Sequence, residues 1–220
     1  MSGKLFVIEG VDGSGKTTQF RLVCEALEGA GAEFRKVNFP RYSEPSSALL
    51  RMYLAGDFGK DPADVGPYAA SAFFAVDRYA SYKTDWGEAY RAGSTVLCDR
   101  YTTSNAIHQA VKLPEEERDR YLDWLFDFEY EKMALPEPTG VYFLDMPDDI
   151  AQRLIIARQG EQGDIHELNH DYLAACRTAA RAVCRRCGWT VIDCVRNDVL
   201  RTPNDICREI TEHMLNQIRG

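Results

Sequence analysis

The chain of 220 residues lacks any apolar run long enough to cross a bilayer, which argues against a membrane-spanning protein. Its first residues, M-S-G-K, precede a short apolar run, L-F-V-I, that is too brief for the hydrophobic core of a signal peptide. Positive charge is also scarce, because 26 Lys and Arg against 34 Asp and Glu give a formal net charge of −8. Binding to a nucleic-acid polymer usually needs a basic face. We therefore expect a cytoplasmic protein that binds neither membranes nor such polymers.

Paired cysteines at the spacing of a zinc site are missing as well. The seven cysteines are an odd number and are scattered, which is typical of free thiols in a reducing compartment. Cys184 and Cys187 form a C-x-x-C, but no second pair of ligands stands at a suitable distance. Their three-residue spacing puts both on one face of an expected helix, so we expect them to pack in the core.

Apolar runs alternate with longer helical stretches, and no internal repeat or low-complexity linker interrupts them. The expected strands are Leu5–Glu9, Phe34–Phe39, Thr95–Asp99, Val141–Asp145 and Thr190–Asp193. The expected helices are Lys16–Ala30, Ser46–Leu54, Pro67–Ala92, Glu115–Met133, Asp148–Arg158, Glu167–Cys187 and Pro203–Ile218. This order predicts a single α/β domain over residues 1–220, with a parallel sheet covered on both faces. Ligands of such sheets bind beyond the carboxyl ends of the strands.

A glycine-rich segment, G-V-D-G-S-G-K-T, lies between the first expected strand and the first expected helix. It has the form G-x-x-x-x-G-K-[ST], in which glycines let several backbone N–H groups face one anion at a helix N-terminus. Lys16 would bring a mobile positive charge to the terminal phosphates, and the Thr17 hydroxyl could ligate Mg²⁺. The motif predicts a nucleotide-phosphate site formed by Gly10, Asp12, Gly13, Ser14, Gly15, Lys16, Thr17 and Thr18.

Acidic side chains end two other expected strands, at Asp99 and Asp145. A carboxylate in this position can hold Mg²⁺ or its water, although it can also simply cap the following turn. Arg100 stands beside Asp99 and would add a fork of donors that binds anions. We therefore favour Asp99 as the metal ligand.

Two segments offer contacts for a second substrate. F-P-R-Y at residues 39–42 ends the second expected strand, and its proline would aim Arg41 and Tyr42 into the crevice at the sheet edge. Phe74 and Arg78 are four residues apart in an expected helix and so share a face. An aromatic plane beside a guanidinium can stack on a base and donate to its carbonyl oxygen. The alternative for F-P-R-Y is an ordinary exposed turn, and the alternative for Phe74 is plain packing in the core.

Together these segments resemble the thymidylate kinase family of nucleoside monophosphate kinases. The matching stretches are I-E-G-V-D-G-S-G-K-T-T-Q (8–19), F-P-R-Y (39–42), F-A-V-D-R (74–78), D-R-Y-T-T-S-N (99–105) and A-L-P-E-P-T (134–139). They occur in family order, and the resemblance fades after Cys187. It implies a P-loop NTPase-type fold, with a five-stranded parallel sheet flanked by helices and a short lid at about residues 153–167. It also implies a homodimer that transfers the γ-phosphoryl of ATP to dTMP, giving dTDP and ADP for dTTP synthesis.

The resemblance further implies roles for individual residues. Lys16 and Thr17 would serve ATP and Mg²⁺, with Asp99 in the metal's shell. Asp12 would hold the region of the acceptor's 3′-hydroxyl, and Arg100 would clamp the acceptor phosphate. Phe74 would stack on thymine and Arg78 would bond a thymine carbonyl oxygen. The other implied acceptor contacts are Phe39, Pro40, Tyr42, Ser104, Asn105 and His108.

The chain departs from the family pattern at two places. Some members carry an arginine inside the phosphate loop, whereas this loop has none. Similar members place a catalytic arginine in the lid, and here Arg158, which borders the polar segment 159–166, is favoured over Arg153. Several relatives also have a tyrosine that screens against a ribose 2′-hydroxyl where this chain has His108. Because histidine is smaller, we expect weaker selection for deoxyribose.

Two alternatives remain open from the sequence. The first is a kinase of the same fold that acts on another nucleotide or on a deoxynucleoside. Arg100 favours a phosphorylated acceptor, and the D-G-F-P-R segment typical of adenylate kinases is absent. The second is a phosphate-loop switch protein, and the absence of an N-K-x-D motif counts against its GTPase form.

Overall fold

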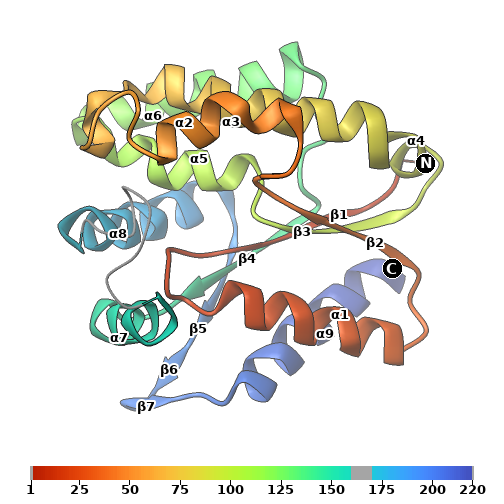
Figure 1. Cartoon of the computed structure of the whole chain (residues 1–220). Coiled ribbons are helices and arrows are strands. Elements are labelled where there is room, and N and C mark those ends of the chain that lie inside the picture. Colours follow the sequence, from red (N-terminus) through yellow and green to blue (C-terminus); the bar gives the residue numbers. More distant parts are fainter. Residues whose placement is uncertain (1, 160–169, 220) are drawn as a thin grey trace.

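The computed structural model describes residues 2–159 and 170–219, and it contains a five-stranded sheet in which all neighbouring strands are parallel (Figure 1). The strand order is β2-β3-β1-β4-β5. The strand bounds are β1 Leu5–Glu9, β2 Phe34–Asn38, β3 Thr95–Asp99, β4 Gly140–Asp145 and β5 Thr190–Asp193. The predicted parallel sheet is therefore confirmed, and its strand bounds differ from the expected ones by at most one residue.

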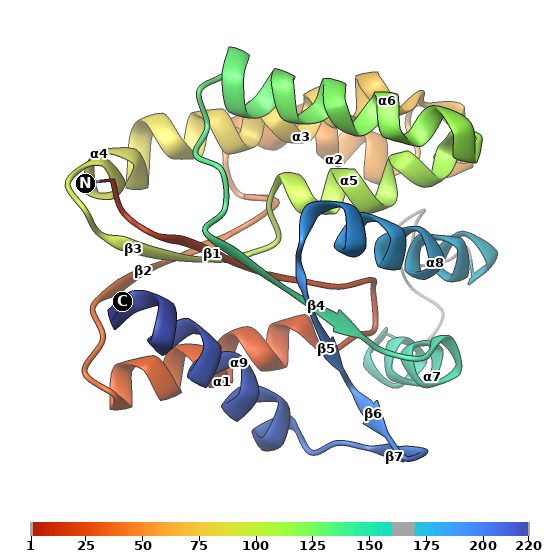
Figure 2. The ribbon, with the colours of Figure 1, turned by 180° about the vertical axis from the view of Figure 1, so that it is seen from behind.

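Helices cover both faces of this sheet (Figure 1). Their bounds are α1 Lys16–Gly29, α2 Ala48–Leu54, α3 Pro67–Ser81, α4 Gly87–Arg91, α5 Thr102–His108, α6 Glu115–Phe126, α7 Asp148–Gln159, α8 His170–Cys187 and α9 Pro203–Arg219. One face packs against α1 and α9, and the other lies beneath α3, α5, α6 and α8 (Figure 2).

The two faces follow from the alternation of side chains along each strand. Phe6 and Ile8 of β1 join the core shared with α1 and α9, whereas Leu5 and Val7 join the core on the opposite face, next to Trp86. All four side chains are fully buried, as expected for a central strand of a parallel sheet. This burial fixes the carboxyl ends of β1, β3 and β4 along one edge.

Several elements differ from the sequence-based expectation. The helix expected over residues 67–92 is one helical run, but it contains a π-helical turn at Tyr82–Trp86. A second π-helical turn, Asp127–Lys132, extends α6. Helix α5 was not predicted, nor was the antiparallel hairpin of β6 (Val195–Arg196) and β7 (Val199–Leu200). The expected start of the next helix, at Glu167, lies outside the described residues. Most of the expected lid also lies outside them.

Across the described residues, the helices include none with both the length and the apolarity that a membrane span requires. All seven cysteines are free thiols, and Cys184 is buried while Cys187 is half-buried. Burial is the main cause that raises the pKa of the Cys184 thiol, to about 12. Core packing therefore accounts for the C-x-x-C segment.

Candidate active site

The glycine-rich segment forms a tight loop between β1 and α1, at the carboxyl edge of the sheet. Gly13 and Gly15 have φ values of 78° and 87°, a backbone conformation that other residues rarely adopt. A Cβ at Gly13 would also lie 2.3 Å from the carbonyl oxygen of Ala151, so α7 packs directly against the loop. The predicted strand–loop–helix context of a phosphate loop is therefore present.

Lys16 folds back over this loop. Its ammonium donates to the carbonyl oxygens of Gly10 and Val11, both at 2.8 Å, and lies 3.6 Å from a carboxylate oxygen of Asp12. Burial and the positive charge of Arg100 lower the pKa of Lys16 to about 8, although Asp12 and other nearby carboxylates oppose the shift. The side chain is thus held by exchangeable contacts, and a phosphate could attract it away from them.

Asp99 ends β3 and has the features of a metal ligand. Its carboxyl group is largely buried, and Oδ1 has no hydrogen-bond partner within the described parts of the chain. Burial raises the pKa of Asp99, while Arg100 and Lys16 hold it down. Thr17 and Thr18 are exposed in the first turn of α1. A carboxylate and a hydroxyl beside a phosphate loop are the oxygen donors that Mg²⁺ takes in phosphoryl-transfer sites.

Asp145, the alternative metal ligand, is already engaged by cations. Arg177 of α8 donates to its Oδ1 at 2.7 Å, and Arg181 lies 3.2 Å from its Oδ2. These two arginines were not singled out from the sequence, because α8 returns to the sheet edge only in the folded chain. The ion pairs favour Asp99 over Asp145 for the metal.

Arg100 joins the phosphate loop to the start of α5. It forms an ion pair with Asp12, donates to the Ser104 hydroxyl at 3.4 Å, and lies 3.8 Å from a carboxylate oxygen of Glu9. Its backbone has φ 64°, a strained value for a residue with a side chain. The structure thus brings four predicted residues, Asp12, Lys16, Arg100 and Ser104, into one charged cluster.

Glu9 organises this cluster, and sequence reasoning missed its role. The residue is fully buried at the end of β1. It accepts hydrogen bonds from the hydroxyls of Thr103 and Ser104, at 2.6 and 2.8 Å, and from the N–H of Gly10. A charged residue at the end of an otherwise apolar strand was the available signal, since such a group is buried only when it is paired.

The F-P-R-Y turn is tied to α3. The Arg41 N–H donates to Asp77 Oδ2 at 2.8 Å, and the Ser46 hydroxyl donates to Oδ1 of the same carboxylate at 2.7 Å. Phe39 is buried with its ring 6.0 Å from that of Tyr101, and it joins Pro40 through a cis peptide bond. Tyr42 is half exposed. The turn is therefore anchored at the carboxyl end of β2, where the sequence placed it.

Residues expected to recognise a base meet at a buried carboxylate. Arg78 donates from Nε and Nη2 to the two oxygens of Glu129, at 2.7 and 2.5 Å. Asn105 donates from its amide to the Ser71 carbonyl at 3.2 Å and approaches Glu129 at 3.5 Å. Phe74 is half-buried on α3, with its ring edge-on to Tyr53 at 6.2 Å. Glu129 itself was not predicted.

The positions at which the chain departs from the family pattern are only partly described. His108 is buried at the end of α5, where its Nδ1 lies 3.6 Å from the Cys176 sulfur and its carbonyl accepts from the Tyr172 hydroxyl at 2.5 Å. The Arg158 side chain lies outside the described residues, so its predicted role stays a prediction. Arg153 is exposed and pairs with Asp149 at 3.0 Å.

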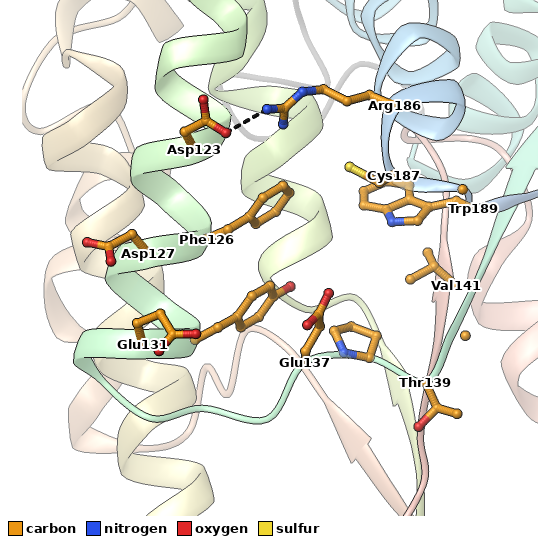
Figure 3. A pocket seen from close by; sticks show the side chains of 14 residues that line it. Asp123, Phe126, Asp127, Glu131, Glu137, Thr139, Val141, Arg186, Cys187 and Trp189 are labelled. Atoms are coloured by element: carbon orange, nitrogen blue, oxygen red, sulfur yellow. Dashed lines mark hydrogen bonds and ion pairs between the residues drawn. The ribbon is translucent and has the colours of Figure 1, made fainter.

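A pocket of about 710 Å³ lies away from these residues (Figure 3). It includes Gly140 and Val141 at the amino end of β4, so it opens at the edge of the sheet opposite the phosphate loop. Its lining carries more carboxylates than cations, and Arg186, which faces it, is paired with Asp123 at 2.6 Å. This charge suits a polyphosphate poorly, so we place the nucleotide site at the phosphate loop instead.

A phosphate loop between a strand and a helix, at the carboxyl edge of a parallel α/β sheet, defines a P-loop NTPase-type protein. The family model described as "Thymidylate kinase" matches residues 8–206. The chain belongs to the thymidylate kinase family and is a kinase.

Individual relatives agree with this assignment. The thymidylate kinase of Mycobacterium tuberculosis is 32% identical over 148 residues, which are 67% of this chain and 68% of that protein. The probable thymidylate kinase of Pyrococcus horikoshii is 33% identical over 147 residues, or 67% of each chain. The solved structure of thymidylate kinase from Candida albicans has a TM-score of 0.73 at 20% identity, covers 98% of this chain and 92% of that one, and supports the fold.

Proposed function

We propose that this kinase transfers the γ-phosphoryl of ATP to dTMP, giving dTDP and ADP. The observation that carries the proposal is the charged cluster in which Arg100 links Asp12 of the phosphate loop to Ser104 of α5. A donor phosphate cradled by the loop and an acceptor phosphate held by Arg100 would then meet across Asp12. Such positioning and charge neutralisation supply most of the rate in phosphoryl transfer.

The remaining residues divide between the two substrates. The loop N–H groups and Lys16 would bind the ATP phosphates, and Thr17 and Asp99 would hold Mg²⁺. When bound, Mg²⁺ neutralises charge on the phosphates. On the acceptor side, Tyr42 would line the sugar and phosphate, and Phe74 and Arg78 would contact the base. His108 is buried at the end of α5, and its weaker selection for deoxyribose stays part of the proposal.

A panel of nucleoside monophosphates tests the activity directly. With ATP and Mg²⁺, we expect kcat/KM for dTMP to exceed the values for dCMP, AMP and GMP, because Arg78 offers donors that match a thymine carbonyl oxygen. Coupled measurement of ADP release gives each constant. Robust turnover of AMP or GMP without turnover of dTMP would refute the proposal.

A homodimer is the proposed assembly, and exposed apolar side chains on α2 and α3 support it. Leu49 and Met52 of α2 and Val76 and Tyr79 of α3 are 37–49% exposed on helices that lie side by side (Figures 1 and 2). Apolar groups clustered on an outer surface commonly mark a protein interface. The cytoplasm is the proposed location, in line with the reduced cysteines.

Val76→Glu is expected to convert the dimer to a monomer, because it would bury a charge in the interface. Sedimentation velocity would measure the change. The control is Leu200→Glu, which alters an equally exposed apolar residue on the β6–β7 hairpin and should leave the dimer intact. A Val76→Glu protein that sediments like the wild type would contradict the proposal.

A further inference from the structure

Glu129 is a fully buried carboxylate that the proposed chemistry does not use. It lies in the π-helical turn Asp127–Lys132, in which Glu131 is exposed. Short π-helical segments interrupt regular helices and are frequent at functional sites. Here the turn carries Glu129 from α6 into the core, toward α3 and α5.

Four donor groups from two other helices converge on this carboxylate. Arg78 donates twice, the Thr102 hydroxyl donates at 2.6 Å, and the Asn105 amide lies 3.5 Å away. Burial alone would lower the pKa of Arg78, but the charge and hydrogen bonds of Glu129 raise it above its ordinary value. Arg78 therefore stays charged although it is only 2% exposed.

The two bonds to Glu129 also fix the direction of the guanidinium plane. They use Nε and Nη2, while Nη1 reaches the Tyr101 carbonyl at 3.4 Å with one of its two N–H groups. The second N–H of Nη1 is not used by that contact, because a guanidinium has five N–H donors in fixed directions. Glu129 thus turns a flexible side chain into a donor of set orientation.

We propose that Glu129 is a positioning residue that determines pyrimidine specificity, by locking Arg78 as a hydrogen-bond donor toward position 4 of the base. This inference rests on the proposed contact between Arg78 and thymine. Thymine carries a carbonyl acceptor at that position, whereas cytosine carries an amino donor. A donor of fixed orientation would bond the thymine carbonyl and repel the cytosine amino group. A guanidinium released from Glu129 could turn away from both bases.

Glu129→Gln tests the proposal, since it keeps the size of the side chain and removes its charge. We expect kcat/KM for dTMP to fall about ten- to a hundredfold, which corresponds to the loss of hydrogen bonds to a charged group. The fall should arise mainly from KM for dTMP, with KM for ATP unchanged. The ratio of kcat/KM for dTMP to that for dCMP should fall with it, and Glu129→Asp should restore part of that ratio.

Controls separate positioning from stability and from the proposed function. Glu131→Gln, in the same turn, should leave both ratio and melting temperature unchanged. A purely structural role would lower the melting temperature of Glu129→Gln without changing the dTMP/dCMP ratio, and that outcome would overturn the inference. If Glu129→Gln does not fold, Thr102→Val removes one donor from Glu129 and must lower the same ratio, or the inference fails. Absence of dTMP turnover in the wild type would instead refute the proposed function.

Discussion

Lys16→Met is expected to lower kcat by about 10²–10³, the usual effect of removing one group that stabilises transition-state charge. Methionine is the suitable replacement because Lys16 is only 7% exposed, and an unbranched apolar side chain fills most of the same volume. Coupled ADP release would measure kcat, and circular dichroism would check the fold. Lys36→Met is the control, since Lys36 is an exposed lysine of β2 that pairs with Glu28.

The same residue predicts an alkaline limit to activity. Since burial lowers the pKa of Lys16 to about 8, the ammonium is charged below that pH and becomes neutral above it. The value of kcat/KM for ATP reports the free enzyme, so it should be level below about pH 8 and decline above it. Lys16→Arg keeps its charge and should lose this decline. Superimposable pH profiles for the two proteins would argue against Lys16 as the titrating group.

Arg100→Ala is expected to lower kcat/KM for dTMP by about 10²–10³, because the acceptor phosphate would lose its positioning clamp. The change should also leave Asp12 and Glu9 without the cation between them, so that their negative charges repel the incoming phosphate. Arg100→Lys should restore little, since an ammonium lacks the planar fork that matches a phosphate. Steady-state kinetics with dTMP varied at saturating ATP would measure the effect.

The matched control is Arg35→Ala, on the strand neighbouring β3. Arg35 is an exposed arginine that forms a long ion pair with Asp85, at 3.9 Å. It should have wild-type kinetics and stability. Wild-type kcat/KM for dTMP in Arg100→Lys would show that a positive charge without the planar fork is enough. Wild-type kcat/KM in Arg100→Ala would rule out Arg100 as the clamp.

Local patterns were enough to predict the frame of the fold. Each sheet strand is a short apolar run, and the phosphate loop is a contiguous motif whose conformation depends on its own glycines. Helix α5 escaped prediction because T-T-S-N is a poor helix former. In the structure its polar side chains are held by carboxylates from β1 and from the turn after α6. That support is tertiary, so no local pattern contains it.

The same reason limits prediction of the site. Arg100 was identifiable because it follows a strand end next to a motif, whereas Glu129 lies 51 residues from Arg78 and looks like one more surface acid of an acidic helix. It is buried within a π-helical turn in which Glu131, two residues further on, is exposed. Only the folded arrangement shows that the Arg78 guanidinium binds this carboxylate instead of solvent.

Four consecutive residues of α3, 76–79, face in two directions. Val76 and Tyr79 face outward, while between them Asp77 anchors the F-P-R-Y turn and Arg78 enters the buried network. All four residues lie within about one helical turn, so a shift of the outer side of α3 would also move the residues that reach the proposed acceptor site. In a dimer, the neighbouring subunit would therefore restrict the movement of α3 behind the proposed dTMP site. Dilution to monomers would remove this restriction. The affinity for dTMP would then depend on enzyme concentration, whereas the affinity for ATP would not.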